Sequence, residues 1–138
     1  MPLPRSPVSV ALSISASGGA ILAALEFRNA TAGTAHLYKV LACLDGRIEN
    51  NLFEIDGPKG PVLYNGRYVK RREPAPADFL ALAPGAELRA TVDLAGSYMF
   101  DQGPGRYRAH YFAINPSRSD ADTLEELVSN NVTFELDR

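Results

Sequence analysis

The amino-acid sequence predicts an all-β fold, an immunoglobulin-like antiparallel β-sandwich of about seven to nine strands. Three observations favour this class. Apolar and polar residues alternate with a period of two in many short stretches, as expected for strands with one buried face. Turn-forming residues, chiefly Gly, Pro, Asn and Asp, separate these stretches at intervals of roughly eight to twelve residues. No long stretch has the period of an amphipathic helix, and a small β-barrel is the competing architecture.

The first two strands are the clearest. Val8 to Ser15 alternates apolar and polar residues, and Ile21 to Arg28 repeats the pattern after Gly18–Gly19. Because two glycines between two such runs form a tight turn, we expect the strands to pair as a hairpin. The polar stretch Asn29 to Gly33 ends the second strand.

The next segment is apolar on both faces of a strand. His36 to Leu44 has apolar residues at most positions, which is typical of a strand buried on two sides, so we expect a central strand here. Asp45–Gly46 ends it. A short strand from Leu52 to Ile55 follows, before the turn at Asp56 to Pro58.

Asn65–Gly66 is the strongest short-range hairpin signal in the chain. A type I′ turn requires positive φ at both central residues, which Asn tolerates and Gly adopts freely. We therefore expect the two flanking arms to pair antiparallel. The expected pairs are Val62 with Val69, Leu63 with Tyr68 and Tyr64 with Arg67.

The second half of the chain continues the strand pattern. Glu73 to Phe79 contains two prolines, which excludes a central strand and predicts a crossing loop with a turn or a single helical turn before Leu80. An apolar group, Tyr98 to Phe100, is expected to close one end of the core. Further strands are expected at Leu88 to Leu94, Tyr107 to Ala113 and Val132 to Leu136.

A polar stretch lies before the last strand. Residues 118–126 are predicted to form a flexible loop, and Leu124 to Leu127, which overlap its end, could make a helical turn. Four acidic residues there are interpreted as solvated rather than as calcium ligands, because their spacing differs from that of an EF-hand loop. They are Asp120, Asp122, Glu125 and Glu126.

The composition sets limits on the class of protein. The chain has 138 residues, so we expect one domain over residues 1–138. A net charge of −2 leaves no basic surplus for binding nucleic acid. The single cysteine excludes an internal disulfide, and no apolar run approaches the about 18 residues of a membrane-spanning helix. Without a signal peptide, the chain as written is expected in the cytoplasm, or in a secreted or periplasmic compartment if an upstream signal has been removed.

No motif for catalysis, a metal or a cofactor is found. The sequence contains no Gly-x-Ser-x-Gly, His-Glu-x-x-His or Cys-x-x-Cys, and its two histidines, His36 and His110, are interpreted as ordinary surface or hydrogen-bonded residues. Cys43 lies in an apolar run, where a thiol is usually a small buried apolar group. We therefore expect no catalytic residue, no metal ligand and no cofactor.

Basic and aromatic residues gather after Asn65–Gly66. Arg and Tyr are favoured at protein interfaces, so this region is the candidate protein-interaction surface. The alternative interpretation is an edge strand whose positive charges discourage aggregation. The candidate residues are Tyr64, Arg67, Tyr68, Lys70, Arg71 and Arg72. Because neighbours on a strand face opposite sides, Lys70 and Arg72 are expected on one face, and Arg71 with Arg67 on the other.

The same region carries a family resemblance. The pattern begins with Val62, Tyr64, Gly66, Val69, Lys70 and Arg71. It continues with Pro74, Asp78–Phe79, Leu82, Pro84–Gly85, the strand Leu88 to Leu94 and Tyr98. It resembles the non-catalytic β domain that precedes the catalytic domain of aspzincin metalloendopeptidases, the deuterolysin and peptidyl-Lys peptidase group. The resemblance extends from about Val8 to Tyr111, and its most specific part is Tyr64 to Leu82.

The resemblance implies a stand-alone accessory domain without peptidase activity. The catalytic half of that family carries His-Glu-x-x-His and Gly-Thr-x-x-Asp, and this chain has neither, since Gly33 to Leu37 begins like the second motif but ends in Leu. The expected function is a non-enzymatic protein-binding module, with the inhibitor or the chaperone of a peptidase as its expected specific role. The alternatives are a structural subunit that assembles through sheet edges and a hydrolase using acidic residues such as Asp78, Asp93 and Asp101.

Overall fold

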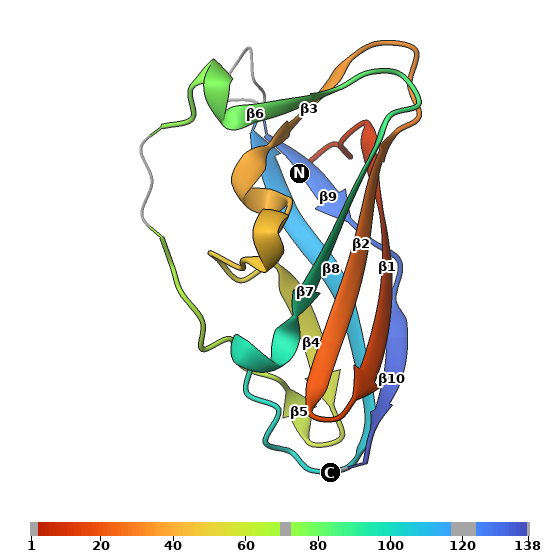
Figure 1. Ribbon diagram of the computed structural model, residues 1–138, viewed down its shortest axis with the longest axis vertical. Coiled ribbons are helices and arrows are strands. Elements are labelled where there is room, and N and C mark those ends of the chain that lie inside the picture. The colour runs from red at the N-terminus through yellow and green to blue at the C-terminus, as the bar shows by residue number, and fades with distance from the viewer. Residues whose placement is uncertain (1–2, 70–72, 117–123, 138) are drawn as a thin grey trace.

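The protein is a sandwich of antiparallel β-sheets, as predicted (Figure 1). A computed structural model describes residues 3–69, 73–116 and 124–137. Within them, strands form two facing layers, and the helical elements are single 3-10 turns. The all-β fold class is therefore confirmed. The 3-10 turns are η1 (Lys39–Leu41), η2 (Leu44–Gly46), η3 (Pro76–Asp78) and η4 (Leu94–Gly96).

The first layer is a three-stranded sheet in the order β1–β2–β7. Its strands are β1 (Val8–Ser17), β2 (Ala20–Asn29) and β7 (Glu87–Asp93). The hairpin between β1 and β2 is confirmed, with Ser17 opposite Ala20. Gly18 and Gly19 have φ of 59° and 87°, the positive values that a two-residue type I′ turn requires.

The second layer is built around a long strand, β8 (Gly105–Pro116). Along one edge, β8 pairs first with β10 (Val132–Leu136) and then with β9 (Leu124–Val128). Its other edge pairs with β4 (Phe53–Gly57), which in turn pairs with the two-residue β5 (Gly60–Pro61). The closing strand β10 has the predicted bounds.

One prediction near β9 is wrong. Leu124 to Leu127 form a strand rather than a helical turn, so residues 124–126 are not part of a flexible loop. The reason is long-range pairing, because the Glu126 backbone exchanges hydrogen bonds with Pro4 and Ser6 near the N-terminus while β9 pairs with β8. Residues 118–123 lie outside the described part of the chain.

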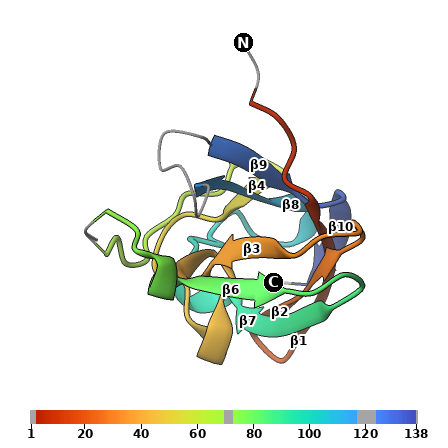
Figure 2. The same cartoon turned by 90° about the horizontal axis from the view of Figure 1, so that it is seen from above.

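A small sheet of β3 (Ala35–Tyr38) and β6 (Phe79–Leu82) lies at one end of the two layers (Figure 2). The helical turn expected before Leu80 is η3, at Pro76–Asp78. Asparagine side chains join this sheet to the rest of the fold. Asn115 donates to the carbonyl of His36 and accepts from the amide of Tyr38, and Asn29 donates to the carbonyl of Leu82.

The predicted central strand from His36 to Leu44 is also wrong. The strand ends at Tyr38, and η1 and η2 follow. Cys43 has a φ of 53° and starts η2 in the left-handed region. Leu41, Ala42 and Cys43 are all buried, so a compact turn directs three consecutive side chains into the core. An apolar pattern of this kind does not distinguish a two-sided strand from a buried turn.

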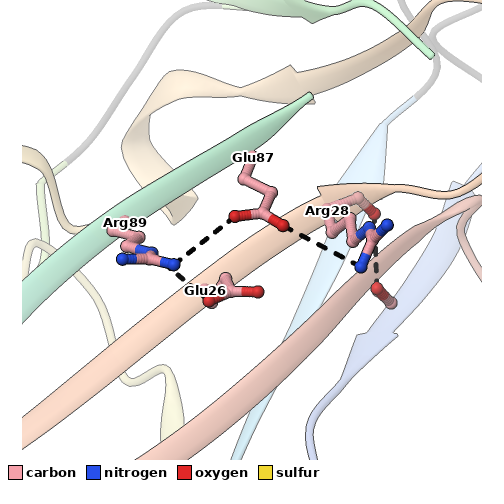
Figure 3. A network of polar contacts seen from close by, with 5 residues as sticks. Glu26, Arg28, Glu87 and Arg89 are labelled. Atoms are coloured by element: carbon pink, nitrogen blue, oxygen red, sulfur yellow. Dashed lines mark hydrogen bonds and ion pairs between the residues drawn. The ribbon is translucent and has the colours of Figure 1, made fainter. Parts of the chain in front are cut away.

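Four charged side chains form a network on the outer face of the first layer, on β2 and β7 (Figure 3). Arg89 on β7 pairs with Glu26 on β2 at 3.3 Å and with Glu87 at 3.5 Å, and Glu87 pairs with Arg28 at 3.8 Å. The signs alternate both along and across the strands. Exposed pairs of this kind contribute about 0.2–1 kcal/mol each.

Candidate interaction surface

The segment Val62–Val69, which we call the strap, does not form the predicted hairpin. Neither Asn65 nor Gly66 has positive φ, so the type I′ turn is absent. The strap instead passes between other elements. Its first residues form backbone hydrogen bonds with β4 and with the segment after η4. Its last residue, Val69, forms one with Glu49. The bonds are Val62 N–H to Ile55 O (2.8 Å), Met99 N–H to Leu63 O (2.9 Å), Asn65 N–H to Ser97 O (2.9 Å) and Val69 N–H to Glu49 O (3.1 Å).

The ring of Tyr64 explains the glycine at position 66. A Cβ added to Gly66 would lie 2.8 Å from ring atoms of Tyr64, closer than any ordinary contact. The Tyr64 hydroxyl donates to the carbonyl of Arg67, which folds the strap back over the ring. Glycine is therefore needed here for close approach of a side chain rather than for a positive φ.

Aromatic rings connect the strap to the core. Tyr68 contacts Tyr64 with ring centroids 5.0 Å apart, and Tyr64 contacts Tyr98 at 5.1 Å. Tyr98 in turn packs edge-on against Phe53 at 6.1 Å. Phe53 contacts the fully buried Tyr111 at 5.7 Å. Because each edge-on pair adds about 0.5–1.5 kcal/mol beyond area burial, the rings hold the strap in a defined position.

Tyr98 is the anchor between strap and core. It is buried, its hydroxyl donates to Asn51 Oδ1 at 2.8 Å, and it accepts from the Phe53 amide at 3.0 Å. Burial raises the pKa of the Tyr98 phenol, and a smaller contribution from Tyr64 raises it further. The phenol is therefore neutral at physiological pH, and both its hydrogen bonds are satisfied.

Large side chains on and beside the strap face solvent. Tyr68 is 69% exposed, Leu63 63% and Met99 40%, and Arg67 is also exposed. Leu63 and Met99 are neighbours across the bridge that pairs Tyr64 with Tyr98. The structure thus places Tyr64, Arg67 and Tyr68 together. The other predicted site residues, Lys70, Arg71 and Arg72, lie outside the described part of the chain.

Sequence reasoning missed two residues of this surface, Leu63 and Met99. Met99 belongs to the apolar group Tyr98 to Phe100 that we expected to close the core. Tyr98 is buried, whereas Met99 faces outward because side chains alternate along an extended segment. The alternation of side chains along an extended segment was the signal in the sequence that could have placed Met99 on the surface.

Two pockets in the structure are lined by residues other than those of the strap. One of about 380 Å³ lies beside the β1–β2 turn, with Tyr98, Phe100 and Leu136 among its walls. Another of about 180 Å³ is lined in part by Cys43 and Asp45. Burial raises the pKa of the Cys43 thiol to about 12, so the thiol is protonated at neutral pH and behaves as the expected small apolar group.

Two of the acidic residues considered for catalysis accept hydrogen bonds from backbone amides. Asp93 Oδ1 accepts from the amides of Ile21 and Ala95, and Asp78 Oδ2 accepts from the amide of Ala75. Neither pocket is lined by Asp78, Asp93 or Asp101. In the described residues no three His, Cys, Asp or Glu side chains come together as a metal site would require. Asp120 and Asp122 lie outside that part of the chain.

The histidines are placed on strands. His110 pairs with Glu54 directly opposite it on β4, with Nε2 to Oε2 at 3.2 Å, and His36 lies in β3.

Comparison with known proteins found no family model that matches the chain and no curated protein that matches it. No helix in the described residues combines the length and apolar character needed to cross a membrane.

Proposed function

We propose that the protein is a non-enzymatic protein-binding module that docks through the strap and Met99. The single observation that carries this proposal is the exposure of Tyr68 and Leu63 on a segment fixed to the core through Tyr64 and Tyr98. A surface held in place before binding loses little conformational entropy when a partner docks. Tyr, Met and Arg are the residue types favoured at such interfaces.

Charge indicates the chemistry of the partner. Between Val62 and Arg72 the sequence has four basic residues and no acidic residue, although the whole chain has a net charge of −2. A partner with an apolar centre and an acidic rim would be complementary to this region. Its association rate should fall as salt is added, because exposed charges steer diffusional encounter.

The partner we propose is a zinc endopeptidase that the module inhibits or escorts. This part of the proposal rests on the resemblance to the accessory domain of aspzincin peptidases and on the absence of that family's catalytic motifs from the sequence. An accessory domain produced as a separate chain would need a stable docking surface, and the strap supplies one.

The test uses the purified chain and zinc endopeptidases encoded beside its gene, with binding followed by calorimetry and peptidase activity measured in parallel. Truncating a central aromatic residue of an interface commonly costs about 2 kcal/mol or more, roughly 30-fold in affinity. We expect Tyr68→Ala to weaken binding by that factor. Leu22→Ala is the matched control, because Leu22 is 41% exposed on the first layer.

Two results would contradict the proposal in different ways. A wild-type chain that neither binds nor inhibits these peptidases would remove the peptidase as partner. Binding that Tyr68→Ala leaves unchanged while Leu22→Ala weakens it would place the docking surface on the first layer instead of the strap.

A further inference from the structure

The outer edge of β7 has unpaired backbone groups. The amide of Asn29 bonds to the carbonyl of Ala86, and strand geometry then directs the backbone groups of Leu88, Ala90 and Val92 toward β2. Those of Glu87, Arg89, Thr91 and Asp93 point away from β2. Among the described residues, no backbone or side-chain group forms a hydrogen bond with these outward groups.

Only part of this edge is open. At Thr91 the backbone of η2 approaches, because a Cβ added to Gly46 would lie 3.6 Å from the Thr91 carbonyl oxygen. The core-facing side chains of β7 also differ between the covered part and the open part of the edge. Val92 is buried, whereas Leu88 and Ala90 are only partly buried although they face the core. The open part of the edge therefore runs from Glu87 to Ala90.

The charges on this edge are complementary to themselves. If two copies pair antiparallel about a two-fold axis at Leu88, Glu87 of each lies opposite Arg89 of the other. Within one chain, Glu87 already lies opposite Arg28 and Arg89 opposite Glu26 (Figure 3). In the dimer, charged side chains would form rows that run across the strands of both copies. Along such a row the charges alternate in sign, in the order Arg28 and Glu87 of one copy, then Arg89 and Glu26 of the second copy.

Other registers fit less well. An axis at Arg89 would place two guanidinium groups opposite each other, which is unfavourable. An axis at Ala90 would place Glu87 opposite Asp93 and would need the part of the edge that η2 approaches. The axis at Leu88 also brings the two partly buried Leu88 side chains together, where each covers the other.

We propose that β7 is a self-association surface, through which a second copy of this chain extends the three-stranded sheet by antiparallel edge pairing. Glu87 and Arg89 exchange backbone hydrogen bonds with Arg89 and Glu87 of the second copy, and their side chains form ion pairs across the axis. The partner is another copy of the same protein, and the strap takes no part. This inference therefore does not rest on the proposed function.

The first test is the mass of the wild-type chain by sedimentation velocity from about 1 µM to about 1 mM, with the chain intact. We expect a monomer at the low end and a dimer at the high end, with dimer formation weakened by salt because the ion pairs are exposed. A monomer at every concentration would overturn the proposal.

A charge exchange tests the register. Arg89→Glu alone places two acidic residues opposite each other in a homodimer, and Glu87→Arg alone places two basic residues opposite each other. We expect each variant alone to dimerise at least tenfold more weakly than wild type, and an equimolar mixture to recover a heterodimer. Variants that dimerise like wild type, or a mixture that does not recover, would overturn the proposal.

A backbone variant separates edge pairing from charge. The amide of Arg89 points to solvent in the monomer, so Arg89→Pro should preserve pairing with β2 while blocking the edge. Arg89→Ala, which keeps the amide, is its control. With the folded state verified by circular dichroism, we expect dimer loss to be greater for Arg89→Pro than for Arg89→Ala. Equal dimerisation of these two variants would contradict edge pairing.

Discussion

The two edges of the β1–β2–β7 sheet differ in how they end. The β1 edge is closed at Leu12 and Val10, since Asn130 accepts from the amide of Leu12 at 2.8 Å and donates to its carbonyl at 3.0 Å, and Val10 forms a bridge with Ser129. The β7 edge has no such partner among the described residues. The same sheet thus has a sealed edge, where the Asn130 side chain and the Ser129 backbone meet the middle of β1, and an open edge at β7.

The closure of β1 depends on an interruption in the opposite layer. β9 and β10 run along the same edge of β8, and residues 129–131 separate them. There Ser129 bonds to Tyr111 instead of continuing the ladder, with Ser129 Oγ accepting from the Tyr111 amide at 2.8 Å. The break allows Asn130 to reach β1.

Opening the β1 edge should have the largest effect. Asn130→Ala removes both hydrogen bonds to Leu12 and leaves a partly buried amide and carbonyl without partners. We expect unfolding free energy to fall by about 2–3 kcal/mol, since an unsatisfied buried polar group costs about 1–3 kcal/mol. Urea denaturation measures the change. Asn65→Ala, in the exposed part of the strap, is the control, and an equal loss in both variants would show that Asn130 has no special role.

Loosening the strap should have a smaller effect, because Tyr64 bridges Tyr98 in the segment after η4, beyond the end of β7 and away from its open edge. Gly66→Ala places a methyl group against the Tyr64 ring, and overpacking of this kind costs about 1–3 kcal/mol. We expect a loss near the lower limit, because the strap is partly exposed. Gly96→Ala is the control, since a Cβ there meets no atom within 4 Å. Unchanged stability of Gly66→Ala would contradict the contact.

The exposed ion pairs near the open edge should matter least for the monomer. Glu26→Gln removes one partner of Arg89, whose pair is on the surface. We expect a change in unfolding free energy within about 0.5 kcal/mol. A loss above about 1 kcal/mol in thermal or urea unfolding would mean that the network stabilises the fold itself and does more than present charge at the β7 edge.

Local patterns predicted the elements whose partners are nearby in sequence. Gly18–Gly19 gave the first hairpin because its type I′ turn depends on two adjacent residues. Asn65–Gly66 has the same local signal, yet its backbone pairs with residues far along the chain. The strand expected from His36 to Leu44 failed for a similar reason, since tertiary packing used its apolar residues in a turn.

The candidate surface was predicted in part. Tyr64, Arg67 and Tyr68 were identified from residue type, and the structure places them together on the strap. Leu63 and Met99 were not, because their proximity depends on the bridge between Tyr64 and Tyr98. The open edge of β7 was likewise hidden, because alternation in sequence reveals which face of a strand is buried but not which edge is paired.

Amide hydrogen exchange at the two edges tests this account most directly. At a concentration where the chain is monomeric, we expect the Leu12 amide to be strongly protected and the Arg89 amide to exchange almost as fast as in an unfolded chain. Raising the concentration should slow exchange at Arg89 and leave Leu12 unchanged. Equal protection of Leu12 and Arg89 in the dilute monomer would contradict the difference between the sealed edge and the open edge.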